Sequence, residues 1–256
     1  MLREKLIEFV AYEVVKAKSF VTAITGEGIN EQKIRDTLNK ALNNYPREID
    51  TLEGFTENPN KAWKYYNIIL QMLADSEPTD AHRALAELES LGILNSIITI
   101  TVSGLHQMAG NKNVLEVHGN INTLKCVSCG RVESVKFPLD QHKMPPKCRH
   151  CSSILKPGYL LYNEQLPSKE MTDAIIDVTV SKIMCIIGFR RVVEPIPSLI
   201  LRAKQCKAII IEINPEKTWI TSKFSDYFID GDINEVLTKI VKSVGRIIKN
   251  TESYIV

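Results

Sequence analysis

The stretch Phe20-Val-Thr-Ala-Ile-Thr25, which runs directly into Gly26-Glu-Gly28, decides the fold class. Its apolar and β-branched residues are typical of a short buried strand, and a polar helical stretch is expected to follow from about 30 to 43. A strand, a glycine-rich turn and a helix form the opening of a dinucleotide-binding unit, because the turn lets a pyrophosphate approach the start of the helix. The signal is weak by itself, since Glu31 stands where the third glycine of the motif would be, and a simple tight turn is the alternative.

The same strand pattern returns three times along the chain. It is found at 96–102, 182–187 and 208–213. Helical spacing of apolar residues predicts helices at about 2–14, 63–74, 79–91 and 237–248. Residues 46–60 are rich in Pro, Asn, Glu and Gly and are predicted to form a loop. Short apolar strands that alternate with helices indicate an α/β fold, a parallel sheet with helices on both faces.

The composition excludes several classes of protein. The 256 residues are 44% hydrophobic, as in an ordinary globular protein, and carry a net charge of +2. Because positive and negative charges nearly balance, the net charge does not indicate binding to a membrane surface. Nucleic acid is expected as a partner only indirectly, if at all. No run of 18 apolar residues is present, and Glu4 and Glu8 interrupt the apolar residues of the N-terminus, unlike in a signal peptide. We therefore expect a cytoplasmic protein without a membrane span, with reduced cysteines.

Four cysteines form two pairs with the spacing of a zinc site. They are found in Cys126-Val-Ser-Cys129 and Cys148-Arg-His-Cys151. The 18 residues between the pairs are typical of a zinc ribbon. Two such pairs fill all four corners of a tetrahedron, so the expected Zn²⁺ is structural and has no open position for water or substrate. The alternatives are four free thiols, or His150 in place of one cysteine ligand.

Several motifs, taken in order, resemble the sirtuin family of NAD-dependent protein lysine deacylases. They are Gly104-Leu-His-Gln-Met-Ala-Gly110, Val114-Leu-Glu-Val-His-Gly-Asn120 with the two cysteine pairs just behind it, and Glu212-Ile-Asn-Pro215. The resemblance runs from about 18 to 245. It implies a Rossmann-like large domain (1–124 and 157–256, with a helical module at about 39–75), an inserted zinc-ribbon small domain (125–156), NAD as cofactor, and an acylated protein lysine as substrate in the cleft between the domains.

The resemblance also implies roles for individual residues. His118 takes the place of the histidine that acts as base on a ribose hydroxyl, for which a neutral imidazole is suited. The alternative is that His118 is a remnant of the fold without a function. The residues that match the family's cofactor contacts are Gly26, Gly28, Asp36, Thr101, Ser103, Gly188 and Asn214. Of these, Asn214 matches the asparagine that holds the adenosine ribose.

The differences from the family pattern are concentrated around this cofactor pocket. Glu27 replaces a small residue where phosphates are expected, Thr101 replaces an Asn, and Ser103 replaces an Asp. Of the family's D-F-R triplet only Asp36 remains, and hydroxyls are lost in Gly188-Phe-Arg190. A carboxylate about 4 Å from a phosphate costs about 4 kcal/mol at an effective dielectric constant of 20. Each lost polar contact costs about 0.5–1.5 kcal/mol more.

The chain is therefore identified as a divergent sirtuin with a degenerate cofactor pocket, whose deacylase activity is expected to be weak or lost. Tyr159-Leu-Leu-Tyr162, where the family grips acyl-lysine, also differs. Two alternatives follow from this degeneracy. The first alternative is a non-catalytic protein-interaction module, in which the zinc ribbon provides rigidity. The second is a sensor that binds a related nucleotide without turnover.

The charges introduced into the pocket suggest a further hypothesis. The loops after the strands at 20–25 and 182–187 are expected to face each other at the switch point of the sheet. Glu27 is therefore predicted to pair with Arg190 or Arg191 and to fill the phosphate site. The alternatives are that all three side chains point into solvent, or that an arginine binds another anion, such as a phosphorylated nucleotide.

Overall fold

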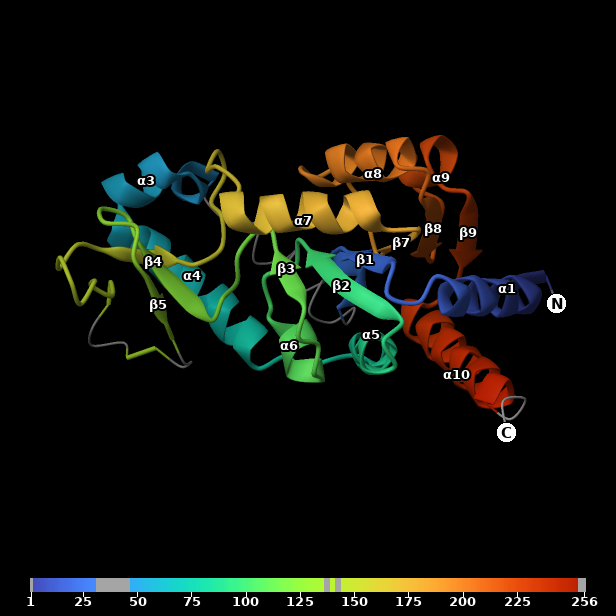
Figure 1. The fold of residues 1–256 in the computed structure, drawn as a ribbon. Coiled ribbons are helices and arrows are strands. Elements are labelled where there is room, and N and C mark those ends of the chain that lie inside the picture. Colours follow the sequence, from blue (N-terminus) through green and yellow to red (C-terminus); the bar gives the residue numbers. More distant parts are fainter. Residues whose placement is uncertain (1, 31–46, 136–138, 141–143, 253–256) are drawn as a thin grey trace.

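The computed structural model describes residues 2–30, 47–135, 139–140 and 144–252 (Figure 1). Most of the helical stretch predicted at about 30–43 lies outside these residues, and so does Asp36. None of the described helices combines the length and the apolar character that crossing a membrane requires.

A six-stranded parallel sheet forms the centre of the fold, in the order β3-β2-β1-β7-β8-β9. Its strands are β1 (Val21–Thr25), β2 (Leu94–Thr99), β3 (Val114–Glu116), β7 (Ile183–Ile187), β8 (Ile209–Asn214) and β9 (Tyr227–Asp230). The strand order reverses between β1 and β7, which pair so that Thr25 lies beside Ile187. In such sheets, ligands bind outside the carboxyl ends of the strands at this switch point.

Helices cover both faces of the sheet, as predicted (Figure 1). One face packs against α1 (Leu2–Lys16), α5 (Asp80–Ser90) and α10 (Ile233–Glu252). The other packs against α7 (Ser168–Val180), α8 (Ile196–Gln205) and α9 (Trp219–Lys223). Successive strand residues point to opposite faces, so Ala23 belongs to the first core and Ile24 to the second. The predicted α/β class is therefore confirmed.

A smaller unit contains both cysteine pairs. Its antiparallel sheet has the order β5-β4-β6 and consists of β4 (Thr123–Cys126), β5 (Val132–Ser134) and β6 (Leu155–Pro157). The sheet shares a core with α4 (Pro59–Ala74), in which the indole nitrogen of Trp63 donates a hydrogen bond to the Leu155 carbonyl at 2.9 Å. The helical module and the cysteine unit therefore hold each other in place.

The prediction of a loop at 46–60 is wrong. This segment forms the short helices η2 (Arg47–Asp50) and α3 (Leu52–Glu57) and the first residues of α4. The residues that suggested a loop begin helices instead: the Thr51 hydroxyl accepts a hydrogen bond from the Gly54 amide, and Pro59 occupies the first turn of α4. Thr at the N-cap and Pro at the first helical position favour helix starts as strongly as turns.

A buried ion pair fixes the segment that leads from β6 back to the six-stranded sheet. The Lys156 ammonium lies 2.8 Å from the Glu164 carboxylate and also donates to the Tyr159 carbonyl at 2.8 Å. The Leu160 amide donates to the carbonyl of His118 at 2.9 Å. Tyr159 is thereby held next to His118.

The remaining short helices are η1 (Glu27–Ile29), which follows β1, and α6 (Leu105–Ala109), which follows β2. Both begin just after the carboxyl end of a central strand, so both contribute residues to the region of the switch point.

Candidate functional site

Two glycine turns pack directly on each other at the switch point. The amides of Gly26 and Gly28 donate to the carbonyls of Ile187 and Gly188, at 2.9 and 2.8 Å. A Cβ on Gly28 would lie 2.6 Å from the Gly188 oxygen, and Gly188 itself has φ of 74°. Only glycine allows so close an approach of two backbones.

A cavity of about 210 Å³ opens beside this contact. Its polar lining consists of Glu27, Asn30, Asp50, Thr101, Ser103 and His118. Tyr159 and apolar residues of α4 and of the segment after β2 complete the wall. This volume accepts one ring or a small group rather than a whole dinucleotide.

His118 is oriented by a backbone contact. Its Nε2 atom lies 2.7 Å from the Glu194 carbonyl, and because that oxygen only accepts, Nε2 carries the proton. The lone pair of the neutral ring is then on Nδ1. Burial lowers the pKa of His118, while the Glu194 carbonyl and the charge of Glu27 act in the opposite direction. A neutral imidazole of this kind is suited to general base catalysis.

Two buried polar atoms in the cavity lining lack a hydrogen-bond partner within the described part of the chain. They are Ser103 Oγ and Asn30 Oδ1, on residues that are 3% and 7% exposed. Buried polar atoms are normally paired. These two therefore suit a ligand that brings hydrogen-bond donors into the cavity, as a carboxamide does.

Thr101 reaches the cavity at the end of a buried chain of hydroxyls. Thr99 Oγ1 lies 2.7 Å from Thr101 Oγ1 and accepts from Thr25 Oγ1 at 2.9 Å. Thr25 in turn lies 2.9 Å from His106 Nε2, and the His106 ring lies 4.7 Å from the ring of His82. The pairing of Thr25 with Thr99 across β1 and β2 builds this chain, so the Thr101 hydroxyl is held by the scaffold.

The two buried histidines are held neutral by the core. Burial lowers the pKa of His106 to about 3 and the pKa of His82 to about 4. The Nδ1 atom of His82 accepts from the Thr79 amide at the start of α5, at 3.2 Å. Both rings therefore belong to the packed core beneath the cavity and have no role in its chemistry.

The cofactor residues predicted from the sequence fall into separate groups. Gly26, Gly28 and Gly188 form the switch-point contact, whereas Thr101 and Ser103 line the cavity of His118. Asn214 lies outside that cavity, and its Nδ2 donates to the Phe189 carbonyl at 2.5 Å. Asp36 is among the residues that are not described.

Asp50 was missed, because it comes from a segment that was predicted to be a loop. Burial raises the pKa of its carboxyl group. No role was predicted for Asn30 either. Its position directly after the glycine turn was the signal that could have identified it.

The predicted pairing of Glu27 with Arg190 or Arg191 is wrong. Within the described residues, Glu27 makes no ion pair with either arginine; it lines the cavity of His118. The reason is Phe189, which is 2% exposed and packs against Gly26. The loop after β7 buries this ring and leaves both arginines exposed to solvent.

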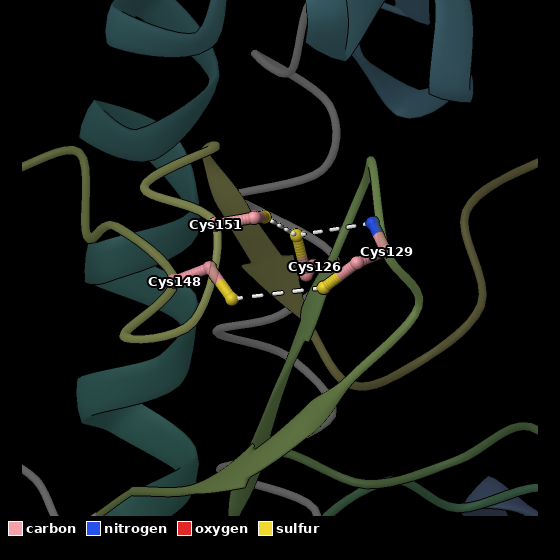
Figure 2. A group of neighbouring side chains, drawn as sticks. All are labelled: Cys126, Cys129, Cys148 and Cys151. Atoms are coloured by element: carbon pink, nitrogen blue, oxygen red, sulfur yellow. Dashed lines mark hydrogen bonds between the residues drawn. The ribbon is translucent and has the colours of Figure 1, made fainter.

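The four paired cysteines converge on one point, as Figure 2 shows. The Sγ atoms of Cys126 and Cys151 are 3.5 Å apart, those of Cys129 and Cys148 are 3.8 Å apart, and all four lie within 4.8 Å of one another. Tetrahedral Zn–S bonds of about 2.3 Å place sulfurs about 3.8 Å apart. The residues thus fit a structural zinc ion with four thiolate ligands, and His150 is not part of the group.

Comparison with known proteins identifies relatives along nearly the whole chain. The Sir2 family model matches residues 25–195. The chain is 34% identical over 247 residues to NAD-dependent protein deacylase 1 of Archaeoglobus fulgidus, covering 94% of this chain and 97% of that protein. It is also 34% identical to the NAD-dependent protein deacylase of Pyrococcus furiosus, with 93% and 98% covered.

Solved structures give the same result. The crystal structure of a Sir2 homolog–NAD complex is 33% identical, with a TM-score of 0.80 over 95% of this chain and 94% of the other. The structure of Sir2Af2 bound to a myristoylated histone peptide is 30% identical, with a TM-score of 0.76 over 98% and 100% of the two chains.

The cysteine cluster predicts one zinc ion per chain. Purified protein should contain one equivalent of zinc by elemental analysis, and Cys148→Ser should lose it, because three thiolates no longer close the tetrahedron. The matched control is Cys206→Ser, which alters a half-buried cysteine outside the cluster and should retain one equivalent. Equal zinc contents in the two variants would contradict this assignment.

The buried histidines predict acid sensitivity. The unfolded chain binds protons at these rings near pH 6.5, whereas the folded chain does so only near pH 3 to 4. The free energy of unfolding should therefore decrease as the pH falls from 6.5 towards 4, by up to about 1.4 kcal/mol per pH unit for each ring. Denaturant titrations at several pH values should give a smaller slope for His106→Gln than for His150→Gln. The same slope in both would show that burial of His106 does not contribute.

Proposed function

This chain belongs to the Sir2 family, and from that premise we propose that it is an NAD-dependent protein lysine deacylase of low turnover, with His118 as general base. The observation that carries the proposal is the shared cavity. It combines a partly buried imidazole whose pKa is lowered with two buried polar atoms, on Asn30 and Ser103, that have no partner within the described residues. The relatives from Archaeoglobus fulgidus and Pyrococcus furiosus, each 34% identical to this chain, are named NAD-dependent protein deacylases.

The residues of the cavity have distinct tasks in this proposal. When bound, NAD would supply a ribose whose hydroxyl receives the acyl group from lysine, with nicotinamide as the leaving group. Asn30 and Ser103 would bind the carboxamide of its nicotinamide group, because their free oxygen atoms accept hydrogen bonds. His118 would take a proton from a ribose hydroxyl at Nδ1, while the Glu194 carbonyl holds the ring through Nε2.

Low turnover is proposed because of one side chain. The Glu27 carboxylate lines the cavity next to His118, at the turn that resembles the family's phosphate-binding loop. A negative charge there opposes the binding of a pyrophosphate. The same observation favours a second candidate function, a Sir2 scaffold that binds a partner or nucleotide without turnover.

The acylated lysine is proposed to enter beside Tyr159. The structure of Sir2Af2 contains a myristoylated histone peptide, so acetylated and myristoylated histone peptides are suitable probes for this chain. Tyr159 lines the cavity and lies on the segment fixed by Lys156 and Glu164.

The two candidate functions are separated by peptide-dependent release of nicotinamide. Wild-type protein should release nicotinamide from NAD and form O-acyl-ADP-ribose, measured by mass spectrometry, only when an acyl-lysine peptide is present. His118→Ala should lower the rate about 100-fold or more, because a positioned base contributes that much. The exposed His150→Ala is the control and should retain the wild-type rate. Absence of turnover in the wild type would leave only the non-catalytic function. Turnover at equal rates in the wild type and His118→Ala would contradict the role of His118 as general base.

A further inference from the structure

The cavity of His118 is lined by acidic groups without a basic counterpart. Glu27 and Asp50 are the acidic side chains of its lining, and no lysine or arginine of the described residues contributes to it. Burial lowers the pKa of His118, so the imidazole is neutral near pH 7 and does not offset the two carboxylates. With both carboxylates ionised, the described lining carries a formal charge of −2 around a volume of about 210 Å³.

Neither carboxylate is satisfied inside the protein. Within the part of the chain that the structure describes, no ion pair or hydrogen bond reaches the carboxylate of Glu27 or of Asp50. Asp50 is half-buried, and burial raises the pKa of its carboxyl group, as expected where no cation compensates the lost water. Burial also raises the pKa of Tyr159, and the negative charge of Asp50 raises it further, so Asp50 lies close to this ring. Both carboxylates are therefore available to a ligand.

Two neutral acceptors face the same space. Ser103 Oγ and Asn30 Oδ1 belong to residues that are more than nine-tenths buried, and neither atom has a hydrogen-bond partner among the described residues. The Asn30 oxygen only accepts hydrogen bonds, and the Ser103 hydroxyl can accept them. An amidinium or guanidinium group offers several N–H donors and a positive charge in one plane. Such a group matches both the charge of the lining and its unused acceptors.

The rest of the wall fits the body of such a cation. Ile69 and Leu73 of α4 and Ile100 and Val102 after β2 form its apolar part, and Tyr159 adds an aromatic ring. An apolar wall with a few convergent polar groups is typical of a site for a small molecule. The face of an aromatic ring also attracts cations.

We propose that the cavity of His118 binds a small organic cation with N–H donors, an amidinium or a guanidinium, with Glu27 and Asp50 as its counter-charges. The inference goes beyond the proposed function, since binding needs neither NAD nor turnover. It gives Asp50 a role, because this carboxylate selects against anionic ligands. One consequence does rest on the proposed function: in an active deacylase, the cation competes with the nicotinamide group for Asn30 and Ser103 and inhibits the enzyme.

Three ligands of the same shape test the preference for positive charge. Near pH 7 benzamidine is a cation, benzamide is neutral and benzoate is an anion, and calorimetric titration compares their affinities. Benzamidine should bind about tenfold more tightly than benzamide, since charge-assisted hydrogen bonds are roughly twice as strong as neutral ones. Benzoate should not bind, and the preference for benzamidine should decrease as salt is added.

The opposite results would overturn the proposal. They are failure of benzamidine to bind, or benzamide that binds as tightly as benzamidine. The second result would leave standing the carboxamide site of the proposed function, because benzamide carries the same carboxamide group as nicotinamide.

Variants that keep the shape of the side chain locate the charge. Asp50→Asn and Glu27→Gln should each lower the affinity for benzamidine and leave the affinity for benzamide unchanged, so the ratio moves towards one. Glu27 is exposed, so its variant decides the question even if Asp50→Asn loses stability. The matched control is Glu53→Gln, which removes the same charge from an exposed position on α3 outside the cavity and should keep the wild-type ratio. Equal losses in Asp50→Asn and Glu53→Gln would contradict a specific site.

NMR of the histidine rings identifies where the cation binds. Saturating benzamidine should shift the ring resonances of His118, which lines the cavity, and leave those of the exposed His150 unchanged. A shift at His150 without one at His118 would overturn the placement.

The deacylase assay separates this inference from the proposed function. Turnover of NAD that persists at saturating benzamidine would overturn the inference and leave the deacylase standing. Tight binding of benzamidine with a shift at His118, but without turnover of NAD in the free protein, would support the inference and overturn the deacylase.

Discussion

The direct packing of the Gly26–Gly28 turn on Gly188 is the constraint on which the site depends. It joins the carboxyl ends of β1 and β7 through two backbone hydrogen bonds, at a distance that excludes any side chain. The charged residues beside the two turns line different cavities. Glu27 lines the cavity of His118, and Arg190 lines a separate cavity at the end of β8. The burial of Phe189 against Gly26 leaves Arg190 on the side away from Glu27, and this divides the charge within the site.

The small unit provides the other wall of the site and depends on a different kind of interaction. Its antiparallel sheet is short, and part of its core comes from α4, through Trp63, and from the buried cysteines Cys126 and Cys148. A metal bound by the four thiolates offsets the entropy of ordering a segment that has few apolar residues of its own. The cavity wall formed by α4 and Tyr159 is thereby coupled to the zinc site.

Much of the scaffold could be predicted from the sequence, since the strands are continuous apolar runs and the cysteine spacing is specific. The helices at 47–59 could not, because Thr51 and Pro59 favour a helix start and a turn alike. The place of Asp50 in the cavity depended on those helices. The hydroxyl chain to Thr101 requires the register of β1 against β2, and the side of the loop on which Arg190 lies is decided by the burial of Phe189; neither is visible in the sequence.

The division of charge depends above all on the position of Glu27, which lies in the cavity of His118 and not at the arginines. Titration of the His118 ring by NMR measures this most directly, because the charge of Glu27 raises the pKa of His118. The pKa of His118 should fall in Glu27→Gln and stay at the wild-type value in Glu216→Gln, which removes the same charge from the separate cavity at the end of β8. An unchanged pKa in Glu27→Gln would contradict the placement of Glu27 and with it the division of charge across the site.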